Sequence, residues 1–179
     1  MLKLIKVPFT YQATTFSCGA AALQSVLFYY GLAMREKEMA EKLHTNPEIG
    51  TKYKSIIELA RTFGFNAEGH LNMTIGQLED KINENIPVIV LIQAWAKQST
   101  NYHNNSGNEH YVVAIGFDRE NFYFMDPYTL GNYTYIPRAD YSQRWHGREG
   151  EIVLEHLGII ITGKKGRAAF NPAEILKLE

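Results

Sequence analysis

The chain of 179 residues contains a single cysteine, Cys18. One cysteine excludes an internal disulfide framework and a zinc site built mainly from cysteine ligands. A free thiol suits a reducing compartment, so we expect a cytoplasmic protein. The longest apolar run, residues 86–92, is far too short to cross a bilayer, and residues 1–6 lack the apolar core and cleavage site of a signal peptide.

The sequence also lacks an excess of charge. Its 18 Lys and Arg residues against 19 Asp and Glu residues give a formal net charge of −1, without the basic stripe that would indicate a nucleic-acid partner. It has no glycine-rich phosphate loop and no HExxH-like histidine pair, so we expect neither cofactor nor metal. A hydrophobic fraction of 45% suffices for one domain over residues 1–179, with residues 163–179 as a C-terminal extension.

Helical periodicity dominates the first half of the chain. Residues 18–30 place Leu23, Val26, Leu27 and Tyr30 on one helix face, with Ser17 as the expected N-cap and Gly31 as the stop. Further helices are predicted over residues 35–43 and 56–63, and from Thr74 to about residue 83, where Thr74 and Gln77 are spaced as a capping box.

Strand-like segments fill the second half. They cover residues 88–92, 110–117, 122–125, 133–136 and 158–162, and residues 118–121 have the composition of a hairpin turn. Residues 97–109 are polar and are expected to form a surface loop, and Asn171-Pro172 is expected to cap a short terminal helix. Helices followed by strands predict an α+β fold in which N-terminal helices pack on an antiparallel sheet.

Cys18 is the candidate nucleophile. A free cysteine, with a pKa of about 8.5, is a poor thiolate at neutral pH. The unpaired N–H groups and the dipole at a helix N-terminus favour the anion, and Cys18 is expected in that first turn. Gly19 and Ala20 are expected to leave room for a substrate. Trp95 follows a buried strand and is expected to be a core aromatic rather than to line a substrate groove.

Three further residues complete a candidate site. The side-chain amide of Gln12 could stabilise a substrate oxyanion together with the N–H group of Cys18. His110 opens one strand of the predicted hairpin, and Asp126 follows the other. Counting from the turn leaves this pair offset by three or four residues, about 10 Å along the strand, so a twist or a bulge must bring the two side chains together.

The ordered set of motifs resembles the C39 peptidases, which are papain-like cysteine peptidases of bacteriocin processing. The resemblance runs from Val7 to Gly147 and rests on these segments: Gln12-x₅-Cys18-Gly-Ala-Ala, Gly64-Phe65, Ile86-Pro-Val-Ile-Val90, His110-Tyr-Val-Val, Asp126-Pro127 and Trp145-x-Gly147. It implies a papain-like fold and cleavage of a peptide bond, typically after a double-glycine leader. Cys18 would be the nucleophile, His110 the general base and then acid, Asp126 the orienting carboxylate and Gln12 the oxyanion donor.

The sequence departs from this family in two ways. Ser17 stands where the family commonly has an aspartate. Many members are fused to an ABC transporter, but this sequence contains no membrane domain or ATP-binding cassette, so any transporter would be a separate partner. Two other functions fit the same residues: an acyl transferase or amidase on the same scaffold, and a peptide-binding module without catalysis.

Overall fold

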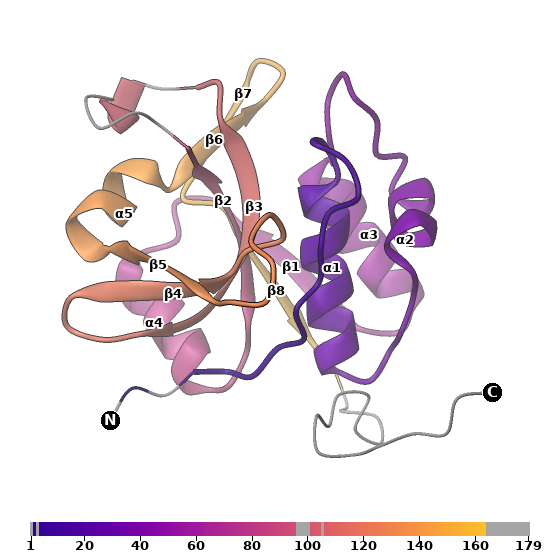
Figure 1. Ribbon diagram of the computed structural model, residues 1–179, viewed down its shortest axis with the longest axis horizontal. Coiled ribbons are helices and arrows are strands. Elements are labelled where there is room, and N and C mark those ends of the chain that lie inside the picture. The colour runs from indigo at the N-terminus through magenta and orange to yellow at the C-terminus, as the bar shows by residue number, and fades with distance from the viewer. Residues whose placement is uncertain (1, 3, 96–100, 105, 164–179) are drawn as a thin grey trace.

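The computed structural model describes residues 2, 4–95, 101–104 and 106–163. Figure 1 shows helices α1 (Cys18–Tyr29), α2 (Glu36–Lys42) and α3 (Tyr53–Thr62) gathered beside a twisted sheet. This arrangement is the expected α+β fold, in which N-terminal helices pack on an antiparallel sheet. No helix in the described residues is both long and apolar enough to span a bilayer.

The main sheet has six strands in the order β1-β8-β2-β3-β4-β5, and every neighbouring pair is antiparallel. These strands are β1 (Asn66–His70), β2 (Val88–Gln93), β3 (Glu109–Phe117), β4 (Asn121–Met125), β5 (Thr134–Pro137) and β8 (Gly158–Thr162). Strands β6 (His146–Glu149) and β7 (Ile152–Glu155) form a separate hairpin. Helices α4 (Ile75–Asn83) and α5 (Arg138–Arg144) and the 3₁₀ turn Tyr102–Asn104 complete the described elements.

Helix α1 forms the central support of the helical layer. It begins at Cys18 as predicted, and its apolar face is fully buried at Leu23, Val26 and Leu27. Gly31 follows the helix with a φ of 102°, a left-handed conformation that favours glycine after a helix C-terminus. Helix α1 packs on β3, so the first turn of the helix and the first residues of β3 come together at one end of the molecule.

Some predicted features differ from the structure. Strand β1 was not predicted because four of its five residues are exposed, as suits the edge of a sheet paired on one side only. The hairpin of β6 and β7 and helix α5 were also missed, because each is only four to seven residues long. The terminal helix expected after Asn171 lies outside the described residues, as does all of the predicted extension except Gly163.

Candidate active site

Cys18 occupies the first turn of α1, where the sequence placed it. Its side chain is 9% exposed and lines a cleft of about 500 Å³. Ser17 is at the N-cap position but makes no capping hydrogen bond; instead its Oγ atom accepts from the N–H group of Thr14 at 3.2 Å. The predicted N-cap position is therefore confirmed, but the Ser17 side chain does not cap the helix, and the start of the helix keeps the electropositive character that favours a nearby anion.

Gly19 and Ala20 do not make room for a substrate. Ala20 is completely buried, and a Cβ atom at Gly19 would lie 2.7 Å from the Cβ atom of Thr51. The missing side chain of Gly19 therefore lets the loop before α3 pack closely against the start of α1. This contact fixes the wall of the cleft next to the thiol, and the earlier expectation was wrong because Thr51 occupies that space.

A β-bulge aligns His110 with Asp126. Val113 pairs with Met125, but Gly116 pairs with Tyr123, so β3 contains one extra residue at this irregularity. Continuing the register past Met125 places Asp126 opposite Val112, two residues from His110. Side chains two residues apart share a face of a strand, whereas without the extra residue Asp126 would lie opposite Val113 and on the other face.

The bulge and the reach of the side chains bring His110 and Asp126 into contact, despite the offset counted from the sequence. The Nε2 atom of His110 lies 2.7 Å from the Oδ1 atom of Asp126. The N–H group of Tyr128 donates to the same Oδ1 atom at 2.8 Å, and the Thr129 hydroxyl donates to Oδ2 at 3.0 Å. Burial acts to raise the pKa of Asp126, but these hydrogen bonds and the His110 ring outweigh it and lower that pKa.

His110 is buried, with only 1% of its surface exposed. Burial alone would lower the pKa of its ring, but the hydrogen bond to Asp126 and the interaction with Cys18 raise that pKa from 6.5 to about 9. Asp126 uses Nε2, and the buried Nδ1 atom has no hydrogen-bond partner among the described residues. Nδ1 is therefore the ring nitrogen left to exchange a proton with the thiol.

Gln12 lies on the loop that leads into α1. Its N–H group donates to the carbonyl oxygen of Pro127 at 3.0 Å, which ties this loop to the turn that follows Asp126. The side chain is 4% exposed, and its Nε2 atom donates to the carbonyl oxygen of Thr14 at 2.8 Å. An amide nitrogen carries two N–H bonds, so the second remains for another acceptor.

Trp95 lies beside the candidate site, although the sequence analysis assigned it to the core. Its ring centroid lies 4.5 Å from that of His110 and 4.9 Å from that of Tyr128. The side chain is 52% exposed and its φ angle is 49°, so the prediction of a core aromatic is wrong. The end of β2 instead turns the indole outward over His110, where it covers one side of the ring.

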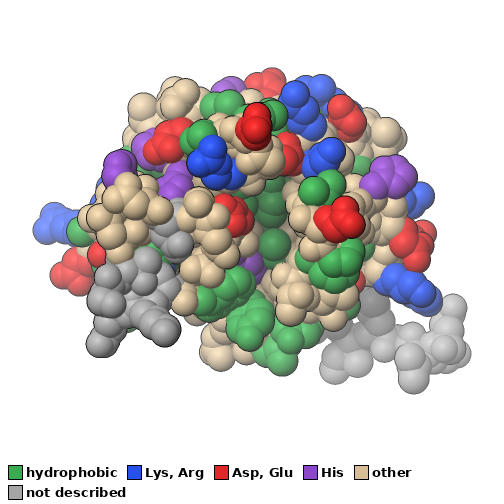
Figure 2. All heavy atoms as spheres, turned by 90° about the horizontal axis from the view of Figure 1, so that it is seen from above, with side chains coloured by type: hydrophobic (Ala, Val, Ile, Leu, Met, Phe, Trp, Pro, Cys, Tyr) green, Lys and Arg blue, Asp and Glu red, His purple; other side chains and the backbone are tan. Residues whose placement is uncertain are grey.

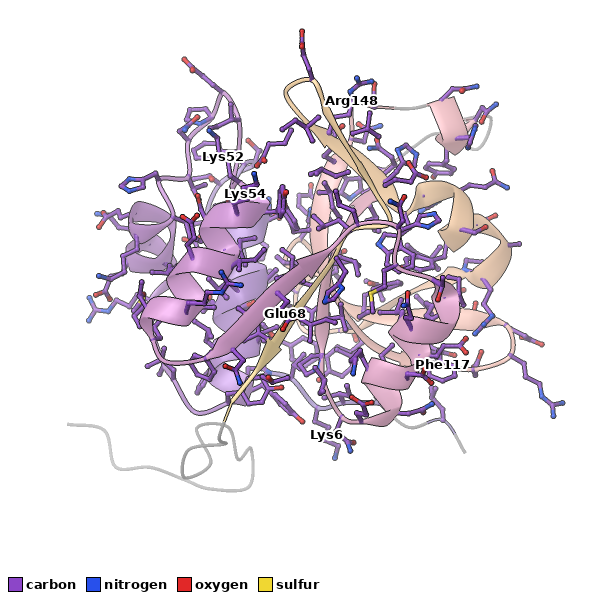
Figure 3. The ribbon with its side chains drawn as sticks, turned by 180° about the vertical axis from the view of Figure 1, so that it is seen from behind. Lys6, Lys52, Lys54, Glu68, Phe117 and Arg148 are labelled. Atoms are coloured by element: carbon purple, nitrogen blue, oxygen red, sulfur yellow. The ribbon has the colours of Figure 1, made fainter. Side chains whose placement is uncertain are left out.

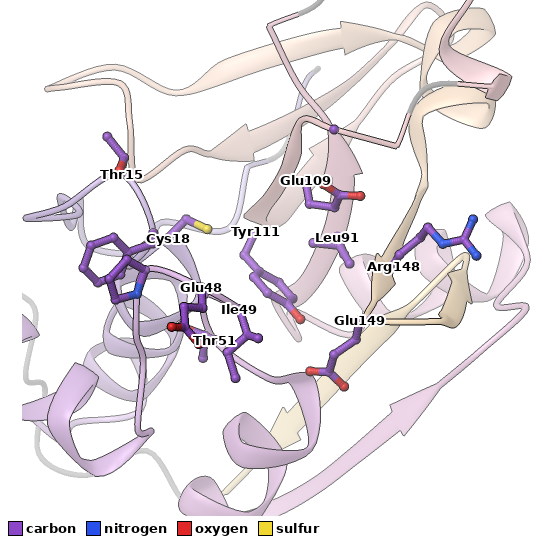
Figure 4. A pocket seen from close by; sticks show the side chains of 15 residues that line it. Thr15, Cys18, Glu48, Ile49, Thr51, Leu91, Glu109, Tyr111, Arg148 and Glu149 are labelled. Carbon is purple, nitrogen blue, oxygen red and sulfur yellow. The ribbon is translucent and has the colours of Figure 1, made fainter.

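The cleft beside Cys18 (the Cys18 cleft) separates the helical layer from the sheet and the β6–β7 hairpin. Figure 2 shows the surface hollowed between these two parts, with hydrophobic side chains at the floor. The lining residues are Thr15, Phe16 and Cys18, loop 47–51, Leu91, Gly107, Glu109, Tyr111 and turn 148–150. Figure 4 shows Cys18 and Tyr111 on facing sides of this space.

Curated relatives carry protease names. The chain is 32% identical over 143 residues to the "Probable functional amyloid protease FapD" of Pseudomonas aeruginosa, covering 76% of this chain and 56% of the relative. For the protein of the same name from Pseudomonas fluorescens, the identity is 30% over 154 residues, covering 82% and 59%. The chain thus spans a little more than half the length of these relatives.

Solved structures share the fold. The peptidase domain of Streptococcus ComA, described as a bi-functional ABC transporter involved in a quorum-sensing pathway, aligns with a TM-score of 0.66 and 23% identity, covering 89% of this chain and 99% of that chain. A putative C39-like peptidase from Bacillus anthracis aligns with a TM-score of 0.68 and 19% identity, covering 93% and 100%. A double glycine motif protease from an AMS/PCAT transporter, solved with its leader peptide, aligns with a TM-score of 0.60 and 22% identity, covering 88% and 92%.

The family model gives the most direct assignment. The model of the Peptidase_C39 like family matches residues 4–153, which include all four candidate site residues and the whole main sheet except β8. The match covers most of the sequence. The chain therefore belongs to the Peptidase_C39 like family.

Proposed function

We propose that the chain is a cysteine peptidase in which Cys18, His110 and Asp126 form the catalytic triad. The observation that carries this proposal is the His110 ring, which bonds Asp126 through Nε2 at 2.7 Å and leaves Nδ1 for the Cys18 thiol. With a pKa of about 9, the ring is cationic at neutral pH and can pair with a thiolate. Such a pair is the usual form of an activated cysteine nucleophile.

The first half of the reaction forms an acyl-enzyme. The Cys18 thiolate attacks the substrate carbonyl carbon, a C–S bond forms, and the carbonyl electron pair moves to the oxygen. The N–H group of Cys18 and the free N–H of the Gln12 amide stabilise this oxyanion. The C–N bond then breaks, and protonated His110 gives its proton to the departing amine.

The second half releases the acid. Neutral His110 takes a proton from water as the water oxygen attacks the thioester carbon. The C–S bond breaks and its electron pair returns to sulfur, so the thiolate and the protonated ring are restored. Asp126 remains ionised throughout, holds the ring through Nε2 and stabilises its positive charge.

For the substrate we propose a peptide or protein cleaved after small residues of the double-glycine type. The double glycine motif protease that shares this fold supports the choice, as does the burial of Cys18 at 9% exposure, which favours a flexible, slender segment at the scissile bond. We also propose a cytoplasmic location, which suits the free thiol, and a separate transporter as a possible partner.

A peptide-cleavage experiment tests this function. Peptides that end a leader in Gly-Gly or Gly-Ala are incubated with the wild-type protein and with the Cys18→Ala variant, and the products are weighed by mass spectrometry. We expect cleavage by the wild type only, with one water added across the broken bond. Equal cleavage by both proteins would show that Cys18 is not the nucleophile.

The same masses test the two other functions. An acyl transferase would give a product that carries an added amine in place of water. A binding module would leave every peptide intact while still retaining it in an equilibrium binding measurement. Neither has an observation in its favour that the peptidase lacks.

A further inference from the structure

The wall of the Cys18 cleft that faces the thiol carries an unused hydrogen-bonding group. Tyr111 is 5% exposed and lines the cleft, and its hydroxyl has no hydrogen-bond partner among the described residues. Figure 4 shows this hydroxyl directed into the cleft, on the side of Glu149. Burial, and then the nearby Glu149 carboxylate, raises the pKa of Tyr111 well above 10, so the group stays an uncharged hydroxyl. The hydroxyl oxygen is open to the cleft rather than sealed in the core, so a ligand atom can become its hydrogen-bond partner.

The charges that line the cleft are mostly negative. Three carboxylates, from Glu48, Glu109 and Glu149, face one guanidinium, from Arg148. None of these four side chains forms an ion pair with another described residue. Arg148 is exposed, and Figure 4 shows its guanidinium turned away from Cys18. The charged side chains that line the cleft therefore carry a net negative charge, while Lys52 and Lys54 act on Glu149 from the start of α3.

The Glu149 carboxylate is fixed by one hydrogen bond and can still accept others. Its Oε1 atom accepts a hydrogen bond at 3.2 Å from the N–H group of Tyr53, the first residue of α3, whose N-cap residue Lys52 supplies no side-chain cap. This bond joins the β6–β7 hairpin to the helical layer across the cleft. The second carboxylate oxygen has no partner among the described residues. Figure 3 shows Lys52 and Lys54 at the start of α3 and Arg148 on the hairpin.

The volume of the cleft exceeds what small residues need. About 500 Å³ lies within the range of roughly 300–1,000 Å³ that is typical of pockets for small ligands. Two glycines at the scissile bond leave most of that space to another side chain of the same peptide. A long side chain with a cationic end would meet a carboxylate, a neutral acceptor and an aromatic ring together.

We propose that the Cys18 cleft binds a lysine or arginine side chain of the peptide substrate, with the Glu149 carboxylate as the counter-charge and the Tyr111 hydroxyl as a neutral acceptor. The claim that the bound peptide is a substrate rests on the proposed peptidase function. The charge preference of the cleft itself can be measured without any peptide cleavage. Tyr111 and Glu149 are thus specificity-determining residues, distinct from the triad.

The first measurement uses peptides. Leader peptides that share one Gly-Gly site carry Lys, Gln or Glu at a single position, scanned along both sides of the scissile bond. At one position we expect kcat/KM for Lys to exceed that for Gln by about tenfold, as for one charge-assisted hydrogen bond, and that for Glu to be lowest. Equal kcat/KM values for Lys, Gln and Glu at every position would overturn the inference and leave the peptidase function standing.

The second measurement uses small thiol reagents. The cationic reagent methanethiosulfonate-ethylammonium and the anionic methanethiosulfonate-ethylsulfonate both form a mixed disulfide with Cys18 and release methanesulfinate. The ratio of their rate constants reports the charge preference beside the thiol. This ratio tests the charge preference of the cleft even if no peptide is cleaved. The absence of cleavage would count against the peptidase function alone.

Matched variants assign the preference to residues. Glu149→Gln keeps the oxygen that accepts from Tyr53 and removes only the charge, so we expect the cation-to-anion ratio to fall about fivefold. Glu151→Gln, an exposed residue on the same hairpin, should leave the ratio unchanged. Tyr111→Phe should lower the preference about twofold, and Tyr141→Phe, which removes a buried hydroxyl outside the cleft, should not. A ratio that Glu149→Gln does not change would overturn the inference.

Discussion

The indole of Trp95 and the imidazole of His110 are in contact, with their ring centroids 4.5 Å apart. Because the indole is half-exposed, it shields one side of His110 and also reports on the charge of that ring. We predict that the fluorescence of Trp95 rises as the pH passes about 9, because the quenching imidazolium of His110 becomes neutral there. Trp145, which stacks on His156, is the second source of emission.

The Trp95→Phe variant separates the two signals. It should lose the transition near pH 9 and keep any transition that comes from Trp145. A transition assigned to Trp95 near pH 6.5, the ordinary value for histidine, would contradict the raised pKa of His110.

The thiol should react quickly at neutral pH because of its neighbour. Iodoacetamide should label Cys18 faster than it labels the same cysteine in the urea-unfolded chain, since His110 can hold the proton that the thiol gives up. His110→Ala should slow labelling at pH 7 by about tenfold, and Asp126→Asn by less, because it weakens the support of the ring without removing it. Rates measured by mass spectrometry that match the unfolded chain in all three proteins would contradict the triad.

The stability of the His110–Asp126 pair should depend on pH in a defined window. The raised pKa of His110 gives stability that is complete below 6.5 and is lost as the pH rises through about 9. The lowered pKa of Asp126 gives stability that is present above 3.8 and is lost as the pH falls through its folded-state value. Asp126→Asn should therefore reduce the free energy of unfolding most between pH 3.8 and pH 6.5, where both contributions are present.

Urea unfolding of both proteins measures this difference. We expect about 2 kcal/mol near pH 6, typical of a hydrogen bond to a charged group, and a smaller value near pH 10. A difference that is constant across this range would mean that the pair is not charged in the folded state.

Gly19 should resist substitution. Alanine would favour a helix by about 1 kcal/mol, but a Cβ atom 2.7 Å from the Cβ atom of Thr51 requires the two backbones to move apart. Overpacking of this kind costs about 1–3 kcal/mol, so Gly19→Ala should be destabilising in thermal unfolding. Adding Thr51→Gly should restore part of the loss, and a double variant no better than Gly19→Ala would refute the contact.

The capping box of α4 offers a change in stability far from the site. Thr74 and Gln77 exchange hydrogen bonds of 3.2 Å and 2.8 Å with each other's backbone N–H groups. Thr74→Ala should cost about 1 kcal/mol of unfolding free energy, as for other N-cap residues. The labelling rate of Cys18 should stay at the wild-type value; a slower rate would show that α4 supports the cleft.

Local signals in the sequence predicted much of the fold. The start of α1 at Cys18, the Thr74 capping box and the hairpin of β3 and β4 follow from nearby residues alone. Strand β1 did not, because its residues Asn66–His70 are mostly polar and exposed, and their pairing with β8 joins residues 88 to 96 positions apart in the chain. The sequence analysis also left the offset between His110 and Asp126 at three or four residues, whereas the bulge makes it two.

The residues of the candidate site also fall into two groups, those that the sequence identified and those that only the structure shows. Cys18, His110, Asp126 and Gln12 could be named because each has a recognisable neighbourhood in the sequence. Trp95 was named but assigned to the core, and Tyr111 and Glu149 were not named, because the importance of these residues comes from what they face across the cleft or over the His110 ring. The space beside Gly19 was misassigned for the same reason, since only the folded chain shows Thr51 in it.

The extra residue in β3 divides the β3–β4 hairpin into a part whose length must be kept and a part whose length can change. Removing one residue between His110 and the irregularity would invert the imidazole to the opposite surface of the sheet, away from its carboxylate partner. The connection at residues 118–120 lies beyond that point, so additional residues there would leave the parity of the two strands intact. That tip is therefore the place to graft a reporter or an affinity tag without disturbing the chemistry.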